Sequence, residues 1–214
     1  MRRKEKASSE PPSRLIVGLS GASGVVFGVR LLEILRGTDL ELHLVMSRTA
    51  EITLAHETDY KVAQVKALAH VVHSNADLGA AIASGSFRTR GMIIAPCSIR
   101  TASEIATGVT STLMSRAADV ILKERRRLVL MVRESPLHTG HLRMLAHLSE
   151  IGAVIAPPLP AFYTRPQSID DIIDQTVGRA LDLFDIDVGS VKRWREPADP
   201  ETRRRPGRQR SRKK

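Results

Sequence analysis

Short apolar runs recur along the chain, and each is followed by a segment that mixes polar and apolar residues. The runs have the length and near-continuous apolar character of strands that are buried on both sides of a parallel sheet. The clear ones are Arg14–Ser20, Glu41–Ser47, Gly91–Cys97, Arg127–Arg133 and Ala153–Ala156. The pattern therefore predicts a parallel sheet built on these five strands.

The segments between these runs place apolar residues at helical spacing. Helices are predicted over residues 24–36, 48–55, 99–107, 112–126, 138–150 and 168–185. Residues 56–90 are less regular, and there the pattern indicates a short strand at His70–His73 and a helix near Ala76–Ala83. Strands that alternate with helices predict an α/β fold: a single flavodoxin/Rossmann-like domain, with helices on both faces of a parallel sheet.

Charge divides the chain into a body and two tails. The formal net charge is +10, but residues 203–214 carry eight basic groups and no acid, and residues 1–14 carry five basic groups against two acids. We expect disordered basic tails over 1–13 and 196–214, since such polar segments bury little apolar surface. Residues 15–202 then carry a net charge of −1, so the body is close to neutral, which leaves open only a weak contact of the tail with RNA or an anionic membrane.

Two features of the sequence bear on the compartment. The single cysteine, Cys97, excludes an intramolecular disulfide and favours a reducing environment. The first apolar run is broken at Ser20 and Gly21, unlike a secretion signal, and no run approaches the roughly 20 apolar residues of a membrane helix. We therefore expect a cytoplasmic protein without a membrane partner.

A glycine-rich turn, Ser20–Gly24, follows the first strand. In parallel sheets ligands bind beyond the carboxyl ends of the strands, where free amides at the start of a helix favour phosphate. A tight turn alone would also select glycine. The glycines at 18, 21 and 24 lack the dinucleotide spacing, and the second strand ends at Ser47 instead of an acid, so a mononucleotide fits better than NAD.

A second junction, Cys97–Thr101, follows the strand at 91–97. Ser98 is a natural N-cap, which accounts for it without a ligand. Two hydroxyl-rich junctions in one sheet can, however, hold one phosphate together. Cys97 is either a reactive thiol at a strand end or, more simply, a buried structural residue.

Charged residues lie near the same predicted strand end. Arg133 and Glu134 directly follow an apolar strand, so both side chains emerge at one edge of the sheet. Arg116 and Lys123 are two turns apart on one predicted helix, so both can face an anion such as an allyl phosphate. Each of these residues would also serve as an ordinary surface ion-pair partner. His138 and His141 lack the glutamate of a metalloprotease motif, so no metal is predicted.

Several motifs, taken in order, resemble the UbiX-type flavin prenyltransferases. Between Leu15 and Trp194 they are GLSGASG, HETD, ASGSF, APCSIRT, RAADVILKERRRLVL, RESPLHTGHL, GAVIAPPLPAFY and KRW. The resemblance implies reduced FMN and dimethylallyl monophosphate as reactants, no metal, and transfer of the dimethylallyl group to N5 and C6 of the flavin. It also implies a homo-oligomer, expected to be a dodecamer with active sites between subunits, and a UbiD-type decarboxylase as the partner that receives prenylated FMN.

The resemblance assigns roles by position. FMN is expected to contact Gly21, Ala22, Ser23, Ser47, Ser98, Ile99, Arg100, Thr101 and Arg133. The allyl phosphate is expected to contact Ser84, Arg116, Lys123, Tyr163 and Arg179, with Arg133 shared between the two ligands. The implied catalytic residues are Ser23, Glu57, Lys123, Glu134 and Trp194. In this assignment Glu134 transfers a proton beside the phosphate, and Trp194 covers the prenyl group.

Two alternatives stay open at this point. A flavin-dependent decarboxylase of cysteine-containing substrates would rely on an Asn-rich loop, and Asn75 is the only asparagine in the sequence. A non-catalytic FMN-carrier subunit would bind flavin without requiring Lys123 or Glu134. The chain departs from the family pattern at Thr112, where Asn is common, and over residues 56–83.

Overall fold

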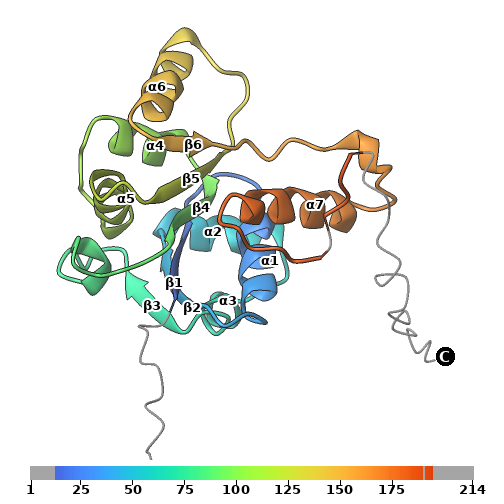
Figure 1. The fold of residues 1–214 in the computed structure, drawn as a ribbon, viewed down its shortest axis with the longest axis horizontal. Coiled ribbons are helices and arrows are strands. Elements are labelled where there is room, and N and C mark those ends of the chain that lie inside the picture. Colours follow the sequence, from blue (N-terminus) through green and yellow to red (C-terminus); the bar gives the residue numbers. More distant parts are fainter. Residues whose placement is uncertain (1–12, 190, 195–214) are drawn as a thin grey trace, which may run out of the picture.

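A computed structural model describes residues 13–189 and 191–194 (Figure 1). Over these residues six strands form one sheet: β1 (Arg14–Leu19), β2 (Glu41–Met46), β3 (Val71–Ser74), β4 (Gly91–Cys97), β5 (Arg127–Val132) and β6 (Ala153–Ile155). Their order is β3-β2-β1-β4-β5-β6, and every neighbouring pair is parallel. The six strands predicted from the sequence are confirmed.

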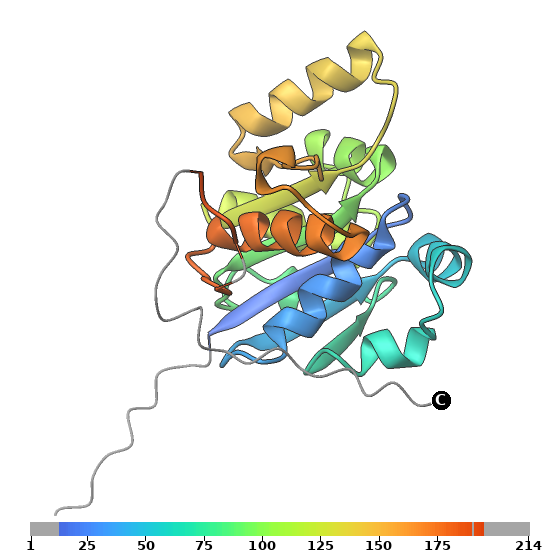
Figure 2. The same cartoon turned by 90° about the vertical axis from the view of Figure 1, so that its right-hand side faces the viewer.

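Helices cover both faces of the sheet, as predicted. In the described ranges they are α1 (Val25–Leu35), α2 (Arg48–Glu57), α3 (Val62–Lys66), α4 (Ile99–Ala106), α5 (Leu113–Lys123), α6 (Thr139–Glu150) and α7 (Ile169–Asp182), with short 3-10 turns η1 (Ala81–Ala83) and η2 (Phe162–Thr164). Figures 1 and 2 show α1 and α7 together on one face and α4 and α5 on the other. Each face has its own cluster of buried apolar side chains, and the α/β fold class is confirmed.

The central strands are almost entirely apolar because helices cover both of their sides. All seven residues of β4 are buried. Helix α1 approaches this strand so closely that a Cβ at Gly28 would collide with the carbonyl oxygen of Ala95. The glycine therefore allows the backbone of α1 to lie directly against the sheet.

The structure corrects the sequence prediction between β3 and β4. The helix predicted near Ala76–Ala83 is wrong, because only η1 forms there. The Asp77 side chain forms a local turn instead, because its Oδ1 accepts a hydrogen bond from Gly79 N at 3.1 Å. Such a turn competes with a helix. The short helix α3 was not predicted, since five residues are too few to show a helical period.

Two predicted helices also end early. Helix α5 stops at Lys123 and α7 at Asp182, each three residues before its predicted end. Arg125 and Asp185 lie just beyond these ends in the left-handed region, with φ of 57° in both cases, which terminates a helix. The predicted tails fall outside the described residues except for Ser13, so the domain boundaries stay predictions. Within the described residues, no helix combines the length and apolar character needed to cross a membrane.

The strand order contains one reversal. From β1 the chain builds outward to β2 and β3 on one side, and then returns to build β4, β5 and β6 on the other. In such sheets the crevice outside the carboxyl ends of the strands at the reversal is the usual ligand site. A ligand site is therefore expected at the carboxyl ends of β1 and β4.

Candidate functional site

The ends of β1 and β4 are tied together by one buried hydroxyl. Ser20, which is 1% exposed, donates from Oγ to the Pro96 carbonyl oxygen at 2.8 Å and accepts from the Ser98 amide at 2.7 Å. These bonds hold the glycine-rich turn after β1 against the start of α4. The two junctions that the sequence singled out therefore lie side by side.

Three helices begin around this point, each capped by a hydroxyl. Ser47 Oγ accepts from Ala50 N at 3.0 Å at the start of α2, Ser98 Oγ from Thr101 N at 3.2 Å at the start of α4, and Thr112 Oγ1 from Ser115 N at 3.3 Å at the start of α5. The three caps line one cavity of about 180 Å³. Its other lining residues are Arg48, Thr49, Asn75, Arg100, Thr101, Glu104 and Met114.

The first amides of two of these helices are open toward a ligand. The first N–H groups of a helix have no acceptor within the helix. Four such N–H groups make no hydrogen bond within the described part of the chain: those of Ile99 and Arg100 in α4 and those of Arg48 and Thr49 in α2. Open amides and the positive ends of helix dipoles together form an anion site, and phosphate is the anion such sites usually bind.

The start of α1 is different, because a carboxylate from the protein already occupies it. Glu57, at the end of α2, accepts at Oε2 from the amides of Gly24 and Val25, at 2.8 and 3.1 Å. This contact places Glu57 next to the turn that carries Ser23, another of the residues implied to be catalytic. It also leaves α4 and α2 as the helices with amides open to a phosphate.

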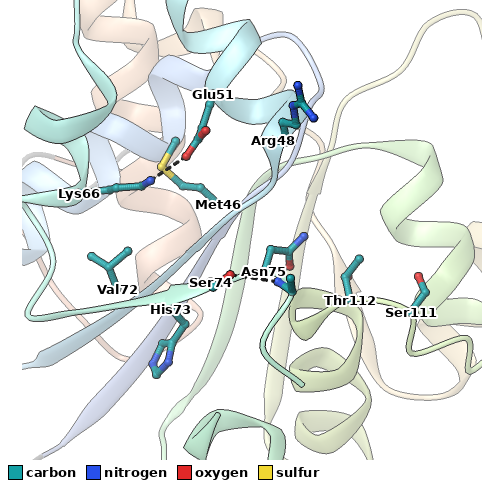
Figure 3. Close-up of a pocket in the computed structure, with 11 residues that line it drawn as sticks. Met46, Arg48, Glu51, Lys66, Val72, His73, Ser74, Asn75, Ser111 and Thr112 are labelled. Carbon is teal, nitrogen blue, oxygen red and sulfur yellow. Dashed lines mark hydrogen bonds and ion pairs between the residues drawn. The ribbon is translucent and has the colours of Figure 1, made fainter. Parts of the chain in front are cut away.

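A larger cavity adjoins this anion site beyond the ends of β2 and β3 (Figure 3). Its volume is about 680 Å³, and it shares Arg48, Asn75 and Thr112 with the smaller cavity. An ion pair of 2.7 Å between Lys66 and Glu51 lies on its wall. The anion site thus borders a wider hollow at the carboxyl edge of the sheet.

Two charged residues of the predicted site lie at the same edge, after β5. The Arg133 amide donates to the Cys97 carbonyl oxygen at 3.0 Å, which fixes Arg133 beside the end of β4. Its guanidinium has no hydrogen bond or ion pair with any described residue. Glu134 follows it and is exposed, with Oε1 accepting from Ser135 N at 3.0 Å. Both side chains are free to meet a ligand at this edge.

Other predicted residues lie at the opposite edge of the sheet. Lys123 ends α5, four residues before β5 begins, and pairs with Glu124 at 2.5 Å. Ser84 Oγ contacts Ser86 Oγ at 2.9 Å in the loop whose Gly85 lies against Lys123. The length of β5, roughly 20 Å at 3.3 Å per residue, separates these residues from Arg133. A single chain therefore does not bring all the predicted residues together.

The remaining predicted residues lie on α5, on α7 and in the segments that flank α7. Arg116 lies on the same half-exposed stripe of α5 as Lys123, as predicted, and is paired with Asp119 at 2.9 Å. Tyr163 packs edge-on against Trp194, with ring centroids 5.4 Å apart. Arg179 on α7 pairs with Asp182.

The buried thiol and the histidine pair are structural in character. Cys97 is fully buried, and burial raises the pKa of its thiol to about 12, so it is not a nucleophile at neutral pH. The ring centroids of His138 and His141 lie 3.6 Å apart with the rings tilted by 30°, and His138 Nδ1 caps α6 by accepting from the Gly140 amide. No group of three or more His, Cys, Asp or Glu side chains that could hold a metal occurs in residues 13–189 and 191–194.

Sequence reasoning missed six of the residues that line the anion site, including three with hydroxyl or amide side chains. Thr49 follows the predicted Ser47, and its Oγ1 lies 2.9 Å from Ser47 Oγ. Asn75 accepts from the amides of Leu113 and Met114, and so caps α5 together with Thr112. Thr112 carried a usable signal, since a hydroxyl residue before an apolar helix predicts an N-cap. Asn75 carried none, because its partners are 38 and 39 residues away.

Comparisons with known proteins identify the family of the chain. The family model described as Flavoprotein matches residues 3–181. The chain is 62% identical over 174 residues to the flavin prenyltransferase UbiX of Escherichia coli strain K12, covering 81% of this chain and 92% of the relative. It is 57% identical over 181 residues to the UbiX of Thauera aromatica, covering 85% and 93%.

Solved structures give the same result. AnUbiX (PadA1), crystallised with FMN and dimethylallyl pyrophosphate, superposes with a TM-score of 0.85 at 51% identity, over 86% of this chain and 98% of that one. The overall fold and the sequence thus point to the same group. The chain belongs to the flavoprotein family and, within it, to the UbiX-type flavin prenyltransferases.

Proposed function

We propose that this protein transfers a dimethylallyl group from dimethylallyl monophosphate to reduced FMN. The observation that carries the proposal is the convergence of three hydroxyl-capped helix starts on one cavity at the reversal of the sheet. Such a site suits one phosphate of a mononucleotide, and the relatives of high identity are flavin prenyltransferases.

The residues present fit FMN. The open amides of Ile99 and Arg100 and the hydroxyls of Ser47, Ser98 and Thr101 would hold its phosphate. Reduced flavin, when bound, supplies nucleophilic N5 and C6 positions that accept the prenyl group. Gly21, Ala22 and Ser23 would then contact the flavin from the turn after β1. The Glu57 carboxylate fixes that turn through its bonds to Gly24 and Val25.

Arg133 and Glu134 are suited to the leaving phosphate. An allyl phosphate departs with charge growing on its oxygens, and a guanidinium without another partner can stabilise that charge. The adjacent Glu134 carboxyl would carry the proton that must move beside the phosphate. Both residues emerge at the edge where the flavin phosphate is expected, so they lie on the correct side of the sheet.

The proposed site requires a second copy of the chain. Lys123 and Ser84 lie at the amino edge, so they can meet the phosphate only from a neighbouring subunit. Helix α6 stands out from the body (Figure 2), buries only Leu148 and exposes Leu142 to 54%. Phe162, at 73%, and Trp194, at 64%, are further large apolar side chains on the surface of this chain.

Self-association would cover such residues. A UbiX-like structure from Escherichia coli O157:H7, with a TM-score of 0.84 at 48% identity over 86% of this chain, is described as dodecameric. We therefore infer a homo-oligomer of this kind. We further infer that the protein acts in the cytoplasm and passes its product to a UbiD-type decarboxylase.

The proposal is tested by anaerobic incubation of the protein with reduced FMN and dimethylallyl monophosphate. Mass spectrometry of the released flavin should show the mass of one added prenyl unit, minus the hydrogen that it replaces. Unmodified flavin after prolonged incubation with FMN-loaded protein would contradict the proposal.

The same assay separates the two alternatives. Lys123→Ala and Glu134→Gln should still bind FMN and should lose prenyl transfer. A carrier subunit would tolerate both changes. A decarboxylase of cysteine-containing substrates would instead release carbon dioxide from a cysteinyl peptide with flavin turnover, which we expect the wild-type protein not to do.

A further inference from the structure

A second cavity lies at the amino edge of the sheet, at the opposite end of β5 from the candidate site. It has a volume of about 520 Å³. Four arginines line it, together with Gly152, Val154, Phe184 and a single acid, Asp185; the arginines are Arg90, Arg125, Arg126 and Arg127. Nothing in the proposed prenyl transfer uses these side chains.

Backbone carbonyls hold three of the guanidinium groups in place. Arg90 donates to the Phe184 oxygen at 2.8 Å, Arg126 to the Phe87 and Gly85 oxygens at 2.6 and 2.7 Å, and Arg127 to the Leu183 oxygen. A carbonyl fixes the direction of a guanidinium but does not neutralise its charge. Each group also has five N–H donors, so most of them stay available for another acceptor.

The acids nearby do not balance this charge. Asp185 lies 3.6 Å from Arg127 and is 86% exposed. Glu124 is 3.9 Å from Arg126 and is engaged more closely by Lys123, at 2.5 Å. The C-terminal ends of α5, α6 and α7 meet here and contribute about −0.5 charge each. This helix contribution is smaller than the charge of four arginines, so the cavity stays positive.

The end of helix α5 does not by itself explain why an arginine stands at position 125. Arg125 lies at the left-handed position that terminates α5, with φ of 57°, where glycine is the favoured residue. Its exposed side chain makes no hydrogen bond or ion pair within the described residues. An arginine at this strained position, facing a cavity with three other arginines, is suited to binding a ligand.

We propose that this amino-edge cavity binds a small polyanion that carries two or more phosphate groups. The planar fork of guanidinium matches phosphate oxygens in pairs, and several forks around one volume favour a multiply charged ligand. The volume lies within the range of about 300–1,000 Å³ that is common for small-molecule sites. None of the residues that line this cavity is assigned a role in the proposed prenyl transfer.

Isothermal titration calorimetry with inorganic pyrophosphate tests the proposal. The full-length protein is first saturated with FMN and dimethylallyl monophosphate, so that the candidate active site is filled. We expect pyrophosphate to bind, and Arg125→Gly and Arg125→Gln to weaken this binding about tenfold, the effect of losing one charge-assisted contact. Arg36→Ala, which removes an exposed arginine outside the cavity, should bind as the wild type does.

Two further readouts separate binding from folding. Arg125→Gly should keep or raise Tm, because glycine is unstrained at this position. Both Arg125 variants should elute from a size-exclusion column as the wild type does. The proposal is overturned if the saturated wild type does not bind pyrophosphate. It is equally overturned if either Arg125 variant binds with wild-type affinity, or if Arg36→Ala weakens binding as much as they do.

Discussion

At the scale of single residues, the candidate site depends on hydroxyls that stand where apolar strands end. Ser47 and Ser98 could be predicted as site residues, because any residue that follows a parallel strand reaches the carboxyl edge. Ser20 lies in the turn that the sequence singled out, but its role in joining the ends of β1 and β4 was not predicted. The positions of Glu57 and Asn75 could not be predicted from the residues alone. Their partners lie more than 30 residues away, and only the packed fold brings them together.

A test of the anion site follows from Ser98. Ser98→Ala removes both the cap of α4 and a hydroxyl of the cavity, so it should lower stability by about 1 kcal/mol and weaken FMN binding about tenfold. Riboflavin, which lacks the phosphate, should bind the variant as it binds the wild type. Ser168→Ala is the matched control, because Ser168 caps α7 in the same way, away from the cavity. Equal loss of FMN and riboflavin affinity would refute a phosphate contact at Ser98.

Two neighbouring histidines, the buried His43 and the half-buried His73, make stability depend on pH. His43 Nδ1 lies 2.9 Å from His73 Nε2, and His43 Nε2 lies 2.9 Å from Glu41 Oε1. Burial lowers the pKa of His43 and outweighs the opposite effect of Glu41; Arg14 and His70 lower it further. Burial also lowers the pKa of His73, helped by His43 and opposed by Asp77.

The lowered pKa values of His43 and His73 make the folded protein less stable at acidic pH. The unfolded chain binds protons at both histidines below about pH 6.5, while the folded protein resists them, so stability falls as pH falls through this range. We expect the free energy of unfolding in urea to be about 1 kcal/mol lower at pH 5.5 than at pH 7.5. His73→Gln should reduce this difference. A difference that is unchanged in His73→Gln would assign the pH dependence to other groups.

At the scale of elements, the hydrophobic periodicity predicted the long, regular strands and helices. The strands β1, β2, β4 and β5 were clear because helices cover both of their faces and every residue can be apolar. The region between β3 and β4 was not predicted correctly, since a turn closed by the Asp77 side chain replaces the predicted helix. The helix ends were also missed, because arginine and aspartate stand at left-handed positions where glycine would have marked the end.

The contact of α1 with β4 gives a prediction at this scale. Gly28→Ala should lower the free energy of unfolding by about 2 kcal/mol, because the new Cβ meets the Ala95 carbonyl and forces helix and strand apart. Gly37→Ala is the control, since the nearest atom to its Cβ is Ile34 O at 3.5 Å, an ordinary contact. Chemical denaturation measures both variants. Equal stability of the two would show that α1 does not depend on this close approach.

At the scale of the whole molecule, the predicted site residues divide between two edges of the sheet. The resemblance placed active sites between subunits, and the single chain is consistent with this, since the length of β5 separates Lys123 from Arg133 and Glu134. Which surfaces meet in the oligomer could not be predicted, because exposed apolar residues such as Leu142 and Phe162 follow no sequence period.

Mixing two inactive variants tests this arrangement. Lys123→Ala and Glu134→Gln should each lose prenyl transfer. Hetero-oligomers reassembled from both should recover part of the activity, because some sites then combine an intact Lys123 with an intact Glu134 from different chains. Reassembled oligomers of each variant alone are the controls. Mixed oligomers that stay inactive would mean that each site draws both residues from one chain.

The central claim is that FMN places its phosphate where α2, α4 and α5 begin. A crystal or cryo-EM structure of the protein with FMN tests this most directly. The account predicts the phosphate within hydrogen-bonding distance of the Ile99 and Arg100 amides and the Ser98 hydroxyl, with the ring above Ser23. An FMN phosphate at the amino edge, or one in the wider cavity without contact to α4, would contradict it.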